Sequence, residues 1–235
     1  MILLGTIINI VAILIGTAAG LLFTNIKERY KETIMQAIGL TVVIIGIQMA
    51  LQTESIIIVL LSLLIGALIG ELLRLDHLLN NFAEVIASKV TTKHRKVNVA
   101  QGFITASLIF GVGAMAILGS LDSGIRGDHG ILYTKSILDG FTALVLTTTL
   151  RFGVVFSIVP IFLFQGTITL LATKINTIVP ELMLNSVISQ ITAIGGILII
   201  AIGLNILKIK EIRVTNLLPA LVVVILFITI QQYLE

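Results

Sequence analysis

The sequence predicts an all-α polytopic membrane protein of about eight transmembrane helices, and composition and segment length support that class. Hydrophobic residues make up 57% of the chain and charged residues only 11%, whereas a soluble domain has about 25% charged residues. Mean hydropathy is +1.14. The apolar segments match the roughly 20 residues that a helix needs to cross a bilayer, and they lack the alternating polarity of membrane β-strands.

Eight apolar segments account for most of the chain, and we expect one transmembrane domain over residues 1–235. In chain order the expected helices span residues 2–23, 34–51, 55–73, 99–121, 131–150, 153–173, 187–207 and 216–234. With eight crossings, 12 of the 15 Lys and Arg residues fall on one side of the membrane. The positive-inside rule makes that side cytoplasmic, which predicts a multi-pass protein of the cell membrane with both termini outside.

The longest predicted loop, residues 75–98, carries apolar residues at helical spacing among polar ones. This pattern is typical of an amphipathic helix lying on the cytoplasmic membrane surface. An ordinary loop helix packed on the bundle fits the pattern equally well.

Two pairs of segments resemble each other. GTIINIVAILIGT from Gly5 aligns with GVVFSIVPIFLFQGT from Gly153, and, with a one-residue slip, AIGLTVVIIGIQMAL from Ala37 aligns with AIGGILIIAIGLNIL from Ala193. The copies are five crossings apart and would therefore run in opposite directions. An inverted repeat of spans one to three and six to eight is typical of secondary transporters, whose sites lie at the repeat interface. Chance similarity between apolar segments is the alternative.

The expected fifth span contains two charged residues, Lys135 and Asp139. A charge inside the bilayer is costly and indicates a functional site by default, and residues four apart share a helix face. One interpretation is a coupling site, in which Asp139 binds a cation or proton and Lys135 competes for it. The alternatives are a structural pair buried between helices, or a pair in a watery vestibule.

The stretch before that span is rich in acidic residues and glycine. Asp122 and Asp128 are candidate ligands at the outer mouth of a site, and His129 follows them. Such groups can bind divalent cations, but their spacing matches no metal motif, and we predict no metal site. Four glycines between residues 119 and 130 indicate a tight, irregular connection, which at membrane depth must be buried in protein or line a wet cavity.

Uncharged polar side chains also fall within the spans. Under the repeat, Asn9 corresponds to Ser157, and Gln48 falls near Asn205. Such symmetric pairs would line a binding site, although ordinary interhelical hydrogen bonds, worth about 0.6 kcal/mol on average, explain each residue singly. Further polar residues of this kind are Ser107, Gln165 and Gln190.

Small residues and one proline mark places where helices pack or break. The GxxxG spacings of Gly16 with Gly20, and of Gly66 with Gly70, let helices approach closely, either within the bundle or between two copies in a homo-oligomer. Pro160 predicts a kink or break in the sixth span, because proline removes a helix hydrogen bond.

Three stretches resemble a known family. They are GVGAMAILGSLDSGIRGD (111–128), LYTKSILDG (132–140) and GLNILKIKEIRVTNLLPAL (203–221). Over essentially the whole chain the sequence is similar to the YqgA/YdfK-like bacterial membrane proteins, the family grouped as domain of unknown function 554. The resemblance implies a polytopic bacterial inner-membrane protein and no established activity.

We expect a secondary transporter of a small solute or ion, coupled to H⁺ or Na⁺. A non-transporting membrane scaffold or stress-related partner, with a structural Lys–Asp pair, is the alternative. The chain has no P-loop, HExxH or GxSxG motif and no Ser/His pair that suggests a hydrolase. We therefore expect no enzymatic activity, no cofactor and no nucleic-acid partner, and a chain that contacts the lipid bilayer and its solute.

Overall fold

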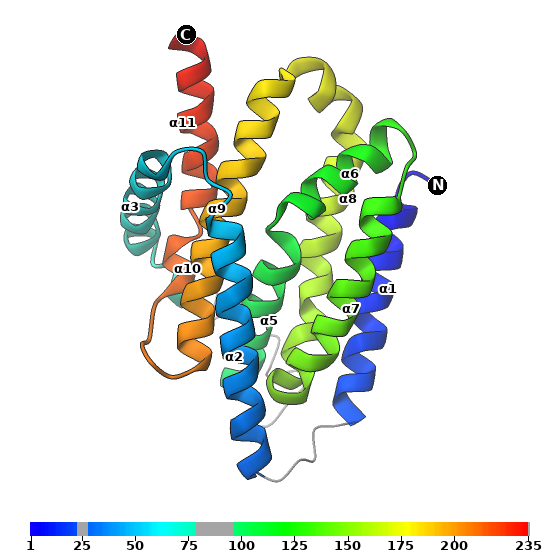
Figure 1. Ribbon diagram of the computed structural model, residues 1–235, viewed down its shortest axis with the longest axis vertical. Helices are drawn as coiled ribbons and strands as arrows, with labels where there is room; N and C mark the ends of the chain where they lie inside the picture. The colour runs from blue at the N-terminus through cyan, green and yellow to red at the C-terminus, as the bar shows by residue number, and fades with distance from the viewer. Residues whose placement is uncertain (23–27, 79–95, 235) are drawn as a thin grey trace. The chain divides into compact units, whose positions relative to one another are not determined.

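The computed structural model describes residues 1–22, 28–78 and 96–234, which are mostly helical and contain no strand (Figure 1). Contacts between Cα atoms divide the chain into two compact units. The first unit comprises residues 1–34 and 83–178, and the second comprises residues 35–82 and 179–235. The prediction of one transmembrane domain stays a prediction.

Each unit is a cluster of helices. The first unit holds α1 (Leu4–Leu22), α5 (Lys96–Gly111), α6 (Ala114–Ile125), α7 (Gly130–Leu150), the 3-10 helix η2 (Arg151–Ser157) and α8 (Ile158–Ile178). The second holds α3 (Ile56–Leu73), α9 (Glu181–Ile206), α10 (Val214–Leu217), α11 (Ala220–Leu234) and most of α2 (Glu28–Ala50).

Within the described residues, six helical stretches are long and apolar enough to cross a membrane, or seven if α5 and α6 form one bent span. One of the six, Gly130–Ile178, is 49 residues long, roughly twice what a bilayer requires. In Figure 1 its two halves, α7 and α8, run in opposite directions on either side of η2. The helical membrane class is confirmed, and the count of eight crossings stays a prediction.

Helices α1 and α7 lie side by side and run in the same direction. Gly5 of α1 lies against Leu132 at the start of α7, and Gly20 lies against Thr147 near its end. Between them, a Cβ atom added at Gly16 would collide with the carbonyl oxygen of Gly140. The glycines therefore let two backbones touch, as expected where helices associate without water to drive them together.

The second GxxxG spacing is also used inside the chain. Gly66 and Gly70 of α3 lie directly against the backbones of Ala220 and Asn216. Both small-residue faces are thus covered by helices of the same chain. Assembly into a homo-oligomer stays a prediction.

The span predicted as one helix over residues 99–121 is broken. Helix α5 ends at Gly111, α6 begins at Ala114, and the two axes differ by 59°. Gly113 has a φ of 154°, a backbone conformation that essentially only glycine adopts.

The irregular connection expected between residues 119 and 130 is shorter than predicted. Gly119 and Gly124 lie inside α6, where they pack against Leu132 and Thr169. Only residues 126–129 separate α6 from α7, and Gly127 alone among them has a positive φ, 67°. Two of the four glycines, Gly119 and Gly124, therefore serve close helix packing rather than a turn.

Pro160 does not kink a continuous helix. Helix α8 begins at Ile158, so the proline lies in its first turn, where a missing N–H breaks no helical hydrogen bond. The chain changes course before the proline, at Arg151, whose φ is 55°, and through η2.

The second unit also brings backbones together at glycines. Gly46 of α2 meets Gly196 of α9, and Gly39 lies against Gly203 of the same helix and against Leu207, the residue that follows it. The surface helix expected over residues 75–98 falls largely on residues 79–95, outside the described part of the chain.

We expect Gly16→Ala to lower the thermal stability of the purified protein in detergent. The new methyl group would overlap the Gly140 carbonyl, and overpacking costs about 1–3 kcal/mol. Gly166→Ala is the matched control, because its Cβ would meet only the Leu3 side chain at 3.9 Å and alanine favours helix. Equal melting temperatures for the two variants would contradict the close α1–α7 contact.

Candidate functional site

A buried ion pair lies within α7. Lys135 Nζ donates to Asp139 Oδ2 at 2.7 Å, and the two residues are one helical turn apart. Each residue is only 6% exposed. Asp139 is the tenth of the 21 residues of α7, so the carboxylate lies near the middle of the helix. The predicted proximity of the two side chains is confirmed.

A third side chain reaches the same oxygen from α1. Asn9 Nδ2 donates to Asp139 Oδ2 at 3.1 Å, and Asn9 is completely buried. The approach depends on the glycine next to the carboxylate, because a Cβ at Gly140 would lie 3.0 Å from the carbonyl oxygen of Ala12. Sequence-distant helices thus place two donors on one carboxylate oxygen.

This cluster has the chemistry of an exchangeable cation site. Lys135 neutralises Asp139. A proton or metal cation could take the place of the ammonium at the carboxylate, with the same charge balance, when the displaced lysine gives up its own proton. The Asn9 Oδ1 atom is buried and has no hydrogen-bond partner within the described structure. A hard cation prefers such oxygen ligands.

A helix break lies in the same unit as Asp139, between α5 and α6. Gly119 of α6 packs against Leu132 of α7, so the helix that follows the break contacts the helix that carries the ion pair. A helix break leaves backbone N–H and C=O groups without helical partners, which is how discontinuous spans bind ions and solutes.

The acidic residues at the other end of the hairpin do not join the cluster. Asp122 pairs with Arg126 at 3.9 Å, and the exposed Asp128 accepts a hydrogen bond from the Gly130 backbone N–H at 2.9 Å. His129 Nδ1 lies 2.9 Å from Ser123 Oγ. The described residues contain no group of three or more His, Cys, Asp or Glu that could hold a metal ion.

The remaining predicted residues are placed separately. Ser157 is buried in the first unit, where its hydroxyl donates to the Val154 carbonyl at 2.7 Å. Gln48 and Asn205 belong to the second unit; Gln48 is exposed, and both polar atoms of Asn205 bind the Ile212 backbone at 2.8 Å. Asn205 therefore holds the loop after α9, and a site-lining role for these residues stays a prediction.

The buried side-chain amide of Gln165 stands out in the structure because it has no hydrogen-bond partner among the described residues. Gln165 of α8 is 0% exposed, and neither its Oε1 nor its Nε2 atom has a hydrogen-bond partner among the described residues. Leaving a buried polar group unsatisfied costs about 1–3 kcal/mol. Its position inside an apolar span was visible in the sequence, but its missing partners are a property of the packing.

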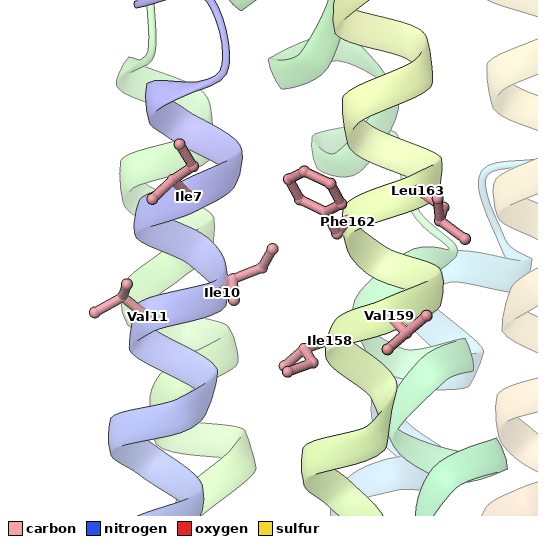
Figure 2. A pocket seen from close by; sticks show the side chains of 7 residues that line it. All are labelled: Ile7, Ile10, Val11, Ile158, Val159, Phe162 and Leu163. Carbon is pink, nitrogen blue, oxygen red and sulfur yellow. The ribbon is translucent and has the colours of Figure 1, made fainter.

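An apolar groove lies on the outside of the first unit. Its lining side chains come from α1 and α8 (Figure 2). The cavity volume is about 410 Å³. Its lining consists of Ile7, Ile10, Val11, Ile158, Val159, Phe162 and Leu163. These side chains offer no hydrogen bond, so the groove suits hydrocarbon and does not suit a polar solute.

Comparisons with known proteins identify relatives over nearly the full length. A family described as proteins of unknown function, DUF554, matches residues 4–229. The uncharacterized membrane protein YdfK of Bacillus subtilis (strain 168) is 37% identical over 231 residues, 95% of this chain and 96% of that protein. The uncharacterized protein YqgA of Escherichia coli (strain K12) is 31% identical over 224 residues, 93% of each chain. No solved structure matches, and the resemblance noted in the sequence is confirmed.

We expect Lys135→Met to destabilise the protein strongly at neutral pH. Removing one partner of a buried pair leaves the other charge uncompensated, at a cost of about 3–5 kcal/mol. The double variant Lys135→Met/Asp139→Asn, which has neither charge, recovers most of the loss. Thermal melting checks both, with Lys174→Met as the exposed-lysine control. Equal melting of Lys135→Met and Lys174→Met would show that the pair is not buried.

Proposed function

The chain belongs to the DUF554 family of proteins of unknown function, and from its buried ion pair we propose that it is a secondary transporter of a small solute or ion, coupled to H⁺ or Na⁺. It works in the cell membrane, with both termini outside. The Lys135–Asp139–Asn9 cluster, inside a helix long and apolar enough to cross the bilayer, is the observation that supports this function most directly.

The free-energy cost of burying the Lys135–Asp139 pair favours a role for it other than stabilising the fold. Well-packed apolar residues in place of a buried ion pair are often as stable or more stable. Ionisable residues inside membrane spans mark ion and proton pathways. The broken span in the same unit is a second feature that transporter sites share.

The glycine contacts of the second unit support the inverted repeat. With the one-residue slip of the alignment, Gly39 corresponds to Gly196, and Gly46 corresponds to Gly203. A rotation that places one copy on the other would therefore place the contact between Gly39 and Gly203 on the contact between Gly196 and Gly46. A two-fold relation between the copies, which an inverted repeat requires, predicts this exchange.

The coupling step is a competition at one carboxylate. When no coupling ion is bound, Lys135 is paired with Asp139 and keeps the span neutral. A proton or Na⁺ that binds Asp139 displaces the ammonium of Lys135, which releases its own proton to water. The span therefore stays neutral while the chain changes its open side. Asp122 and Asp128 contribute at the outer mouth. Differential binding of the ion to the two open states drives the cycle.

A membrane scaffold is the second candidate. The direct 2.7 Å contact, with Asn9 as a further donor, also suits a structural pair that fixes α1 against α7. In that case the charges hold the helices and bind no ion. In both proposals the protein has no enzymatic activity.

We expect a ligand of the wild-type protein to raise its melting temperature, and Asp139→Asn to remove that shift. A screen would test protons, Na⁺, divalent cations, small anions and amino acids. A ligand at one hundred times its Kd adds about 2.7 kcal/mol to the stability of the folded state. Asn keeps an acceptor oxygen for Lys135 and Asn9 but removes the countercharge of Lys135, so each ligand shift is measured from the variant's own ligand-free melting temperature. An equal shift in wild type and Asp139→Asn would contradict ion binding at this carboxylate.

Exchanging the charges separates the two candidates. The double variant Lys135→Asp/Asp139→Lys keeps a pair one turn apart, and the Asn9 amide can turn its Oδ1 toward the new lysine. A scaffold would recover its stability and its cellular role. A transporter would recover stability only, because the carboxylate has moved by one turn, and we expect this second result in melting and phenotype measurements.

A further inference from the structure

The unpartnered amide of Gln165 lies in the same helix cluster as the ion pair. One turn before it on α8, Ile161 lies beside Gly111 at the end of α5, and one turn after it, Thr169 lies against Gly124 of α6. Gln165 is therefore level with the beginning of α6, just past the break. Its neighbour Gly166 lies near Leu3 at the start of α1.

Other buried polar atoms of the first unit also lack a partner in the described structure. The Thr6 Oγ1 and Asn9 Oδ1 atoms of α1 and the Thr169 Oγ1 atom of α8 are buried without a hydrogen bond in the described structure. Thr6 and Asn9 are one turn apart, and Asn9 joins α1 to Asp139. Since native proteins leave few buried polar groups unpaired, an amide whose donor and acceptor atoms both lack a partner indicates that something polar binds there.

The charge of this interior limits what can bind. Among the described residues, Lys135 and Asp139 are the only buried charged side chains, and they neutralise each other. An ionic solute would need an additional countercharge, because an unpaired buried charge is very costly. The unpartnered atoms provide amide and hydroxyl groups, which both donate and accept hydrogen bonds.

We propose that the interior around Gln165 binds a small uncharged solute with both donor and acceptor groups, such as a short polyol or a small amide. Gln165 is its specificity-determining residue: Nε2 donates to a solute oxygen and Oε1 accepts from a solute hydroxyl or amide. This assignment rests on the proposed transport function and names its substrate class. The coupling ion binds Asp139, so ion and solute occupy different residues of one cluster.

The stability of unliganded variants gives the first test. Replacing an unsatisfied amide by an apolar side chain of similar length is neutral or stabilising, so Gln165→Met and Gln165→Leu should melt at or above the wild-type temperature. Gln190→Met is the matched control, because Gln190 is also buried but accepts a hydrogen bond from Thr53 at 2.8 Å; it should melt lower. A loss for Gln165→Met as large as that of Gln190→Met would overturn the proposal.

Transport gives the second test. Counterflow of radiolabelled erythritol and malonamide into proteoliposomes would be measured beside malonate and sodium. We expect at least one neutral solute to enter, at a rate at least tenfold lower in Gln165→Met and unchanged in Gln190→Met. Malonate or sodium alone entering, at a rate insensitive to Gln165→Met, would overturn this substrate class and leave the proposed function standing. No flux of any compound would overturn both.

Discussion

The hydrogen-bonded contact between Lys135 and Asp139 imposes requirements that the rest of the first unit meets. Two charges near the middle of an apolar helix must be neutralised and hydrogen-bonded, because the bilayer offers neither water nor counterions. The lysine supplies the charge from one turn away, and Asn9 supplies a second donor from another helix. That second donor is possible only where the backbones of α1 and α7 touch.

The helices approach each other closely at positions where glycine, which has no side chain, faces the neighbouring helix. Glycines at the α1–α7 contact let the two backbones touch. The same kind of contact occurs between α5 and η2, where Gly102 lies beside Gly153. Helices in a membrane gain little from hiding apolar surface, so packing and hydrogen bonds decide which of them associate. The break at Gly113 and the unpartnered amide of Gln165 lie in the same unit as the carboxylate. Charge, helix break and amide therefore all belong to the first unit.

The sequence predicted the features that depend on local spacing. Residues four apart share a helix face, so the Lys135–Asp139 contact followed from their numbers alone. The Asn9 contact did not, because 130 residues separate its partners and only the packing of α1 on α7 joins them. The bend at Gly113 was missed because hydropathy records how apolar a segment is and not the direction of its backbone.

The structural role of each glycine was the feature that the sequence predicted least well. It permits both a turn and a close helix contact, and the neighbour that decides between them is distant in the chain. Leu132 makes Gly119 a packing residue, whereas Gly127, with no atom within 4 Å of an added Cβ, serves the turn. Gln165 shows a similar limit, since its polarity was evident but its lack of partners arises only in three dimensions.

The most direct measurement is ion flux in proteoliposomes that contain the purified protein. Radioactive sodium uptake and a trapped pH-sensitive dye would report Na⁺ and H⁺ movement, with the solute panel supplied on both sides. If Asp139 is the coupling site, the wild type and the surface variant Glu211→Gln will move one of these ions, and Asp139→Asn will move neither. Equal ion flux in Asp139→Asn and wild type would contradict the account and make the carboxylate a structural element of the α1–α7 contact.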